Sequence, residues 1–423
     1  MFSPDQIRAL YNDKRLKMYD VPRMHVLANS IIMRPGCERL QRLFEMHANM
    51  QEAKYKVAKE VDPFYERYPP IESLCSPTPD RLALAGLPTG DVLSIHKSEL
   101  CRHVGIFGAT GGGKTNVIRS IAAQCLNDDI TMVWISLKED AVSCNALRQD
   151  NVVVLDVADI RIALLQPPPE QNIREFIENF SDIFSRSLNI YASKNFLIDC
   201  LHKLYSEKPQ PSYVELLKLV ERERPDRNYG SVADYREKIL SFGKLLHYAL
   251  GDCIDYAQSD SLDRLFAFRG LTVISCSQLS SAIRTFYASY LLNYIFQRRR
   301  DQRNVTHLVL MILDDAQDLL SGAAYTEATD RYSPIVSRAL DARSRLIGLL
   351  GGLQSFQHTS PAFKQQCSTM IFTQARGDDA FAIQRWLGLT PQETAKLQTL
   401  MPGEVITNTA LCGVQFGRVP LIA

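Results

Sequence analysis

The sequence lacks the features that mark several large classes of protein. Its ten cysteines include no C-x-x-C pair, which argues against a zinc site or a disulfide framework and indicates buried thiols in a reducing compartment. No stretch approaches the roughly 18 apolar residues of a membrane-spanning helix, and the first 20 residues hold no apolar signal-peptide core. We therefore expect a soluble, cytoplasmic protein without a membrane partner.

An excess of charge of one sign is also missing. The 48 Lys and Arg residues face 47 Asp and Glu residues, which leaves a formal net charge of +1. No global basic field attracts nucleic acid, so any grip on a polyanion has to come from a local loop or from assembly. With 46% hydrophobic residues, the 423-residue chain has a globular composition, and its length predicts two or three structural units around one large core.

Short apolar runs alternate with helical segments from about residue 82 onward. Their unalternated pattern is typical of strands that are buried on both faces of a sheet. The expected strands are Val104–Phe107, Met132–Ser136, Val152–Leu155, Leu271–Cys276, Leu308–Leu313, Ile347–Leu350 and Met370–Phe372. Alternation with helices predicts βαβ units and an α/β fold with a largely parallel, doubly wound sheet.

Two regions differ from this pattern. Residues 1–80 predict a helical, polar N-terminal segment with apolar residues at helical spacing and a proline-rich end; the apolar positions are Leu40, Leu43, Phe44 and Met46. In residues 170–265 the strand pattern disappears, and amphipathic helices are expected at Ile173–Phe184, Asn195–Tyr205 and Tyr213–Glu223. We predict a helical segment 1–80 and an α/β domain 81–423 that carries an all-helical insertion, 170–265.

The segment Gly108-Ala109-Thr110-Gly111-Gly112-Gly113-Lys114-Thr115 matches the phosphate-binding pattern G-x-x-x-x-G-K-[ST] at every fixed position. It follows the strand HVGIF and precedes a helix, as the motif requires. Its glycines let backbone N–H groups surround phosphate oxygens, and the helix N-terminus adds a positive dipole end. Lys114 would reach the β- and γ-phosphates of ATP, Thr115 would bind Mg²⁺, and Asn116 would complete the nucleotide site.

An apolar strand about 200 residues further on runs into the paired carboxylates Asp314 and Asp315. Asp314 would hold Mg²⁺ directly or through water, and Asp315 stands where a catalytic carboxylate would polarise the attacking water. Two adjacent carboxylates favour hydrolysis over transfer to a substrate hydroxyl. The alternative is a buried strand that ends in a solvated turn.

The order and spacing of these motifs, followed by ARSRLIGLLGGLQSF, FTQARGDDAFAIQRWLGLTPQE and LQTLMPGEVI, resembles the HerA/FtsK superfamily of ring-shaped DNA-pumping ATPases, and HerA-type translocases most closely. The resemblance implies a RecA-like P-loop ATPase domain. It also implies that Gln354 reads the γ-phosphate, that Arg343 or the nearby Arg345 reaches a nucleotide, and that Arg102 acts across a subunit interface. The chain departs from the family in Asp315, where glutamate is usual, and in its helical N-terminal segment, where HerA proteins have a β-barrel.

Several basic residues invite a role in DNA binding. Arg298, Arg299 and Arg300 close a predicted helix, where the macrodipole attracts cations, so a solvated helix end is favoured over a DNA contact. A channel-lining role stays open for Arg186, Lys194 and Lys203 of the helical insertion.

The resemblance implies a hexameric, Mg²⁺-dependent ATPase that translocates double-stranded DNA. A separate nuclease or effector subunit is the expected partner, in DNA-end processing or anti-phage defence. A second hypothesis is a nucleotide-gated scaffold with slow hydrolysis that assembles or licenses an effector; Asp315 and the N-terminal helices favour it. A soluble motor for secretion or conjugation and an unrelated P-loop enzyme, such as a kinase, remain open.

Overall fold

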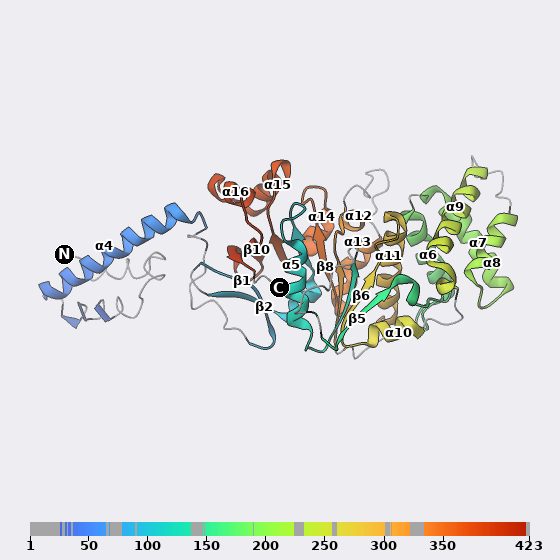
Figure 1. Ribbon diagram of the computed structural model, residues 1–423, viewed down its shortest axis with the longest axis horizontal. Coiled ribbons are helices and arrows are strands. Elements are labelled where there is room, and N and C mark those ends of the chain that lie inside the picture. The colour runs from blue at the N-terminus through green and yellow to red at the C-terminus, as the bar shows by residue number, and fades with distance from the viewer. Residues whose placement is uncertain are drawn as a thin grey trace.

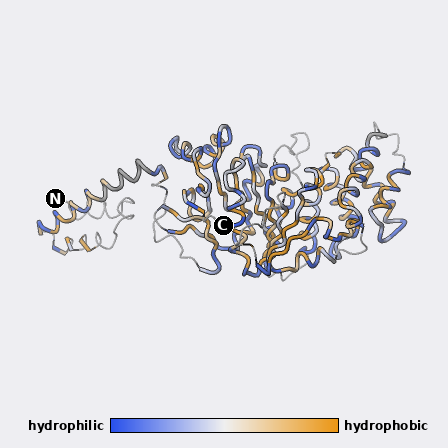
Figure 2. Tube along the Cα trace, in the orientation of Figure 1, coloured by the Kyte–Doolittle hydropathy of each residue, from blue (hydrophilic) through white to orange (hydrophobic). Residues whose placement is uncertain are grey.

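The computed structural model describes residues 26–27, 30–31, 33–34, 37–64, 67, 78–88, 91–136, 147, 149–188, 190–223, 232–255, 260–300, 305, 307–321 and 334–419. Figure 1 shows an elongated molecule with a sheet at its centre, helix α4 (Glu38–Val61) at one end and a group of helices at the other. Hydrophobic residues concentrate along the central strands (Figure 2).

The described residues form an eleven-stranded sheet. From one edge to the other, its strands are β2 (Val92–His96), β1 (Arg81–Gly86), β11 (Gly413–Arg418), β10 (Glu404–Thr409), β9 (Thr369–Phe372), β3 (Val104–Phe107), β8 (Ile347–Leu353), β7 (Leu308–Leu313), β4 (Ile130–Ser136), β6 (Gly270–Ser275) and β5 (Val152–Asp156). From β9 to β5 all neighbouring strands are parallel, and from β2 to β9 they are antiparallel. The predicted α/β fold with a largely parallel sheet is confirmed.

All seven predicted strands are present, with small differences at their ends. The four antiparallel strands β1, β2, β10 and β11 were not predicted. The sequences of β10 (EVITNT) and β11 (GVQFGR) mix polar residues and glycine with apolar ones, so neither contains a long apolar run. They sit outside the parallel part of the sheet, and they extend it rather than build the predicted core.

The helices between the parallel strands cover both faces of the sheet. Helix α5 (Lys114–Cys125) leads from β3 toward β4, whereas α14 (Pro361–Gln366) leads from β8 to β9, in the opposite direction across the sheet. Because such crossovers are right-handed, the two helices lie on opposite faces. Helices α11 (Ser281–Arg298) and α13 (Pro334–Ala342) pack together on the face that carries α14.

The remaining elements are short. They are the helices α12 (Gln317–Leu320), α15 (Gly377–Leu387) and α16 (Pro391–Gln398), and the 3-10 turns η3 (Lys97–Arg102), η5 (Val157–Asp159), η6 (Tyr191–Ser193), η7 (Gly251–Ile254) and η9 (Arg343–Arg345).

Five helices stand between β5 and β6, where the sequence loses its strand pattern: α6 (Ile173–Ser187), α7 (Lys194–Glu207), α8 (Tyr213–Arg222), α9 (Val232–Leu250) and α10 (Asp260–Ala267). On α6, Phe176, Phe180 and Phe184 are spaced four residues apart and stack with centroids 5.9 Å apart. Phe286 of α11 packs edge-on against Phe180 and Phe184. This aromatic row fixes the helical part to the sheet domain; the domain limits themselves stay predictions.

Helix α4 confirms the helix expected around Leu40 to Met46, and the first 25 residues lie outside the described part. Phe44 is 2% exposed, whereas Met46 is 58% exposed, so the apolar stripe of the helix is only partly covered. After α4, Phe64 is buried against Phe416 of β11, with ring centroids 5.8 Å apart. That contact ties the N-terminal helix to the antiparallel edge of the sheet.

We predict that Gly348→Ala destabilises the fold by about 1–3 kcal/mol, because over-packing a strand forces backbone to move. A Cβ atom on Gly348 of β8 would lie 2.3 Å from the Leu100 carbonyl oxygen in η3. Gly86→Ala in β1 is the matched control, since its Cβ would meet only the Arg418 carbonyl oxygen at 3.8 Å. Denaturant unfolding should separate the two variants; equal free energies of unfolding would contradict the packing of η3 on β8.

Candidate nucleotide-binding site

The loop between β3 and α5 has the shape of a phosphate cradle. A Cβ atom on Gly108 would lie 1.9 Å from Thr373 Oγ1 at the end of β9, and the φ of 154° also favours glycine. Gly113 (φ 94°) is the N-cap of α5, so the N–H groups of the first helical turn face the loop. Helix N-termini of this kind are suited to bind anions.

Lys114 begins α5 and is almost fully buried. Its Nζ donates hydrogen bonds to the carbonyl oxygens of Gly108 (2.8 Å) and Ala109 (3.1 Å). Phosphate oxygens entering the loop would compete for these donors, because a charged acceptor forms the stronger bond. The other predicted loop residues are Thr110 and Gly111, which are exposed, Gly112, which is buried, and Asn116, which is half-buried in the first turn of α5.

The predicted metal ligands lie together although they are far apart in the sequence. Thr115 Oγ1 donates to Asp314 Oδ2 (3.1 Å), and Asp314, directly after β7, is 3% exposed. Asp314 Oδ1 accepts the backbone N–H of Asp315 (3.0 Å). A Cβ atom on Gly352 of β8 would lie 3.2 Å from the same oxygen, so the neighbouring glycine leaves room for the carboxylate.

Asp315 adopts a left-handed backbone conformation, with φ 52°. Aspartate tolerates this conformation better than most residues other than glycine. The backbone beyond it is fixed by a hydrogen bond from Ala316 N to Gly352 O (2.7 Å). Asp315 is half-buried and lines the same cleft as Asp314.

Gln354 lies directly after β8, between the P-loop strand and the strand of the two aspartates. Phe107 pairs with Leu353, so Gln354 stands level with Gly108. The backbone N–H of Gln354 donates to Gln317 Oε1 (3.1 Å) in α12, and its side chain is exposed. The structure therefore brings Gln354 to the same edge of the sheet as the P-loop and the aspartates.

The predicted arginines lie at the opposite end of the parallel strands, where β3 and β8 begin. Arg102 stands just before β3 and Arg343 just before β8, at the amino ends of strands whose carboxyl ends carry the P-loop and Gln354. The seven residues of β8 span about 23 Å at about 3.3 Å per residue. Neither arginine side chain can reach a nucleotide on its own P-loop.

Arg343 is exposed, and its side chain has no hydrogen bond or ion pair to any other residue in the part of the chain that the structure describes. Arg102 pairs with Glu99 (Nη1 to Oε2, 3.1 Å). Burial raises the pKa of Cys101, and the charges of Arg343 and Arg102 both counteract that rise, so the two arginines share one neighbourhood.

Arg345 is committed to packing instead. Its guanidinium lies over the Phe296 ring, 3.7 Å from the centroid, and donates to the Phe296 carbonyl oxygen. Between the two alternatives left open by the sequence, the exposed Arg343 is therefore the better placed to contact a neighbouring subunit.

A buried histidine links the segments that carry the two arginines. His103 Nδ1 accepts the backbone N–H of Leu349 in β8 (3.0 Å), and its Nε2 donates to the carbonyl oxygen of Ala339 in α13 (2.8 Å). His103 is 1% exposed and has φ 62°. It follows Arg102 directly, and Ala339 is one helical turn before Arg343, so the imidazole fixes both backbones.

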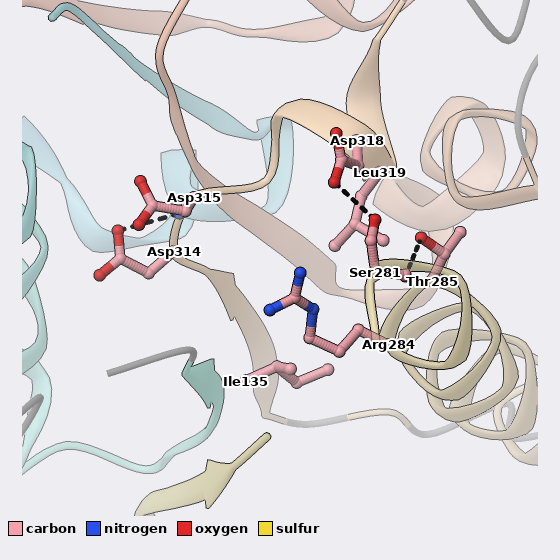
Figure 3. Close-up of a pocket in the computed structure, with 8 residues that line it drawn as sticks. All are labelled: Ile135, Ser281, Arg284, Thr285, Asp314, Asp315, Asp318 and Leu319. Atoms are coloured by element: carbon pink, nitrogen blue, oxygen red, sulfur yellow. Dashed lines mark hydrogen bonds between the residues drawn. The ribbon is translucent and has the colours of Figure 1, made fainter. Parts of the chain in front are cut away.

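A cleft opens beside the two aspartates (Figure 3). Its lining comes from the ends of β4 and β7, the first turns of α11 and α12: Ile135, Ser281, Arg284, Thr285, Asp314, Asp315, Asp318 and Leu319. Ser281 Oγ donates to Asp318 Oδ2 (2.6 Å), which joins α11 to α12. Arg284 lies in no recognisable sequence motif, so the sequence analysis does not include it among the predicted site residues.

The basic residues considered for DNA binding have acceptors within the chain. Arg298 pairs with Glu170 and Asp263, Arg300 with Glu175, Arg186 and Lys194 with Asp182, and Lys203 with Glu223. Arg299 is 3% exposed and donates to the carbonyl oxygens of Arg345 and Leu346, each at 3.0 Å. The prediction that this helix end is solvated is therefore wrong for Arg299, because its guanidinium is buried and donates hydrogen bonds to backbone carbonyl oxygens.

The residues present fit a nucleotide-bound Mg²⁺. Magnesium is usually held by one or two protein oxygens together with phosphate oxygens and water, and the Thr115 hydroxyl and Asp314 carboxylate supply such a pair. Within the described ranges, no group of three or more His, Cys, Asp or Glu residues is arranged to hold a metal ion alone.

Comparison with known proteins shows a family model and a fold that this chain resembles. The family model described as "Helicase HerA, central domain" matches residues 90–295. The resemblance to the HerA/FtsK superfamily is confirmed. A search of curated proteins finds no match.

Solved structures of two proteins share the fold along most of the chain. The plasmid coupling protein TrwB with the GTP analogue GDPNP is 15% identical, with a TM-score of 0.59 over 83% of this chain and 91% of that one. TrwB with ADP and Mg²⁺ is 14% identical, with a TM-score of 0.56 over 83% and 91%. VirB4 of Thermoanaerobacter pseudethanolicus is 12% identical, with a TM-score of 0.59 over 82% and 97%. The predicted RecA-like P-loop fold is confirmed.

No helix in the described part of the chain is long and apolar enough to span a membrane.

We predict that stability falls as the pH drops below about 6.5 and that His103 contributes to this fall. Burial lowers the pKa of His103 below its ordinary value of about 6.5. Below that pH the unfolded chain binds a proton that the folded chain does not. The free energy of unfolding therefore falls by up to about 1.4 kcal/mol per pH unit. Denaturant midpoints of the wild type and His103→Asn between pH 5 and 7.5 should show a shallower slope for the variant.

His307 provides an internal control in the same scan. Burial and the charges of Arg299 and Arg269 lower its pKa to about 4, and this contribution is retained in the His103→Asn variant. Identical slopes for the two proteins would contradict a lowered pKa of His103 in the folded protein.

Proposed function

We propose that this HerA-like P-loop protein is a Mg²⁺-dependent ATPase that works as a ring of identical subunits, a hexamer by resemblance, and translocates double-stranded DNA. The hydrogen bond between Thr115 and Asp314 carries the proposal, because it joins the phosphate loop to the acidic strand in the arrangement that P-loop hydrolases use. The TrwB structures with an ATP analogue and with ADP and Mg²⁺ support the choice of ligands.

Each predicted residue then has a defined task. Lys114 would exchange the carbonyl oxygens of Gly108 and Ala109 for phosphate oxygens. Mg²⁺ would neutralise charge that develops on those phosphate oxygens, with Thr115 and Asp314 as its protein ligands. Asp315 would orient the attacking water, and Gln354, on the neighbouring strand, would contact the terminal phosphate.

The placement of the arginines supports assembly into a ring. Arg102 and Arg343 lie at the sheet edge opposite their own P-loop, so a nucleotide within their reach has to belong to another subunit. A contact that joins one edge of a subunit to the opposite edge of the next is head-to-tail, and such contacts close into rings. A guanidinium offers the planar donors that suit phosphate charge.

The DNA substrate and the partner rest on the resemblance to HerA-type translocases. The near-zero net charge excludes a global basic surface, so phosphate contacts would have to be gathered inside the ring. The sequence contains no nuclease motif, which makes a separate nuclease or effector the natural partner. DNA-end processing or anti-phage defence in the cytoplasm is the setting that we propose.

A nucleotide-gated scaffold is the second candidate. Asp315 is one methylene shorter than the glutamate usual in the family, which would slow hydrolysis. Helix α4 exposes Leu43, Met46 and Met50, and this surface would suit docking of an effector. Under this hypothesis, nucleotide binding would control assembly, and duplex DNA would not accelerate turnover.

We predict that linear duplex DNA stimulates steady-state ATP turnover and that Lys114→Ala abolishes it. Lys218→Ala, an exposed lysine on α8, is the matched control and should keep wild-type turnover. A flat, slow rate with ATP-dependent assembly would favour the scaffold. Unchanged hydrolysis in Lys114→Ala would overturn the site itself.

A further inference from the structure

Arg284 is a half-buried cation in the cleft beside the two aspartates. Figure 3 shows its guanidinium reaching from α11 toward the end of β7, where Asp314 and Asp315 lie. Its helix is held in place, because Ser280 caps it and Ser281 Oγ donates to Asp318 Oδ2 (2.6 Å). The backbone from which Arg284 extends toward the cleft is therefore fixed.

The Arg284 side chain makes no hydrogen bond or ion pair with any other residue that the structure describes. This is unusual for a guanidinium of intermediate exposure, since each unpaired donor away from water costs free energy. The other charged residues of the cleft have partners: Asp318 is bonded to Ser281, and Asp314 to Thr115. Arg284 is the one cation of the lining.

We propose that Arg284 is a catalytic residue that contacts the terminal phosphate of the nucleotide bound to the P-loop of its own subunit. This inference rests on the proposed function. In the described chain, no ion pair within 4 Å joins Arg284 to Asp315, so Asp315 is not the partner of Arg284. An anion from outside is the remaining partner, and the terminal phosphate is the anion expected next to Thr115 and Asp314.

Lys114 and Arg284 would approach the bound phosphates from two different sides of the site. Lys114 approaches from the P-loop, two strands away from β7, and Arg284 approaches from α11, beyond β7. A cation on this side would stabilise charge on the terminal phosphate without contacting the other phosphates. Arg284 therefore acts in its own subunit, in contrast to Arg343, which would act in the next one.

The test is whether Arg284 discriminates nucleotides by their terminal phosphate. We expect Arg284→Ala to weaken binding of a non-hydrolysable ATP analogue with Mg²⁺ by about 10-fold, the loss of one charge-assisted hydrogen bond, and to leave ADP affinity unchanged. Hydrolysis should fall by on the order of 10²-fold. Arg284→Lys should recover part of the loss, and Arg174→Ala on the exposed face of α6 is the matched control.

Retained ADP binding shows that the variant is folded, so its outcome can be interpreted. An unchanged ratio of analogue to ADP affinity would overturn the proposal and leave the ATPase function standing. A defect confined to DNA-stimulated turnover would also overturn it, because the cleft would then face DNA. If the wild type binds neither nucleotide, the proposed function fails together with this inference.

A mixing experiment tests whether Arg284 acts in its own subunit. In rings that combine Arg284→Ala and Lys114→Ala subunits, no P-loop has both Lys114 and Arg284, so we expect no recovery of turnover. Recovery above either variant alone would show that Arg284 serves a neighbouring subunit and would contradict the assignment.

Discussion

Parallel strands impose the constraint on which the site depends. Because β3, β8 and β7 run side by side in one direction, whatever follows them gathers at one edge of the sheet, and whatever precedes them gathers at the other. The P-loop, Asp314 and Gln354 follow their strands, whereas Arg102 and Arg343 precede theirs. One subunit therefore presents the phosphate-binding half of the proposed site on one edge and the arginine half on the opposite edge. Under the proposed function, a complete site requires two subunits.

Backbone strain is concentrated at these same two edges. Among the described residues, three that are not glycine have positive φ: His103 (62°), Asp315 (52°) and Leu346 (50°). His103 and Leu346 immediately precede β3 and β8 beside the arginines, and Asp315 follows β7 next to the predicted metal ligand. Such conformations cost on the order of 1–3 kcal/mol each and persist where the surroundings fix them. Buried hydrogen bonds of His103 and the bond from Ala316 N to Gly352 O provide that support.

Much of this arrangement could be predicted from the sequence. Uninterrupted apolar runs predicted the parallel strands correctly, and the fixed residues of the P-loop and the Asp-Asp pair predicted where the proposed nucleotide site lies. The antiparallel strands β10 and β11 were missed because polar residues and glycine interrupt them. The sequence also could not show that the arginines lie far from the P-loop of their own subunit. Arg102 is only a few residues from the P-loop in the sequence, but the two stand at opposite ends of β3. Arg284 was missed for a related reason: only the folded sheet brings the first turn of α11 to the end of β7.

The claim that one site is built from two subunits is tested most directly by mixing Lys114→Ala and Arg343→Ala proteins. Each variant alone should be inactive, because every interface lacks either the lysine or the arginine. In an equal mixture, about a quarter of head-to-tail interfaces join an intact P-loop to an intact Arg343, so the account predicts recovered ATP turnover. A mixture no more active than the separate variants, in particles shown by mass to contain both, would contradict a site shared across the two sheet edges.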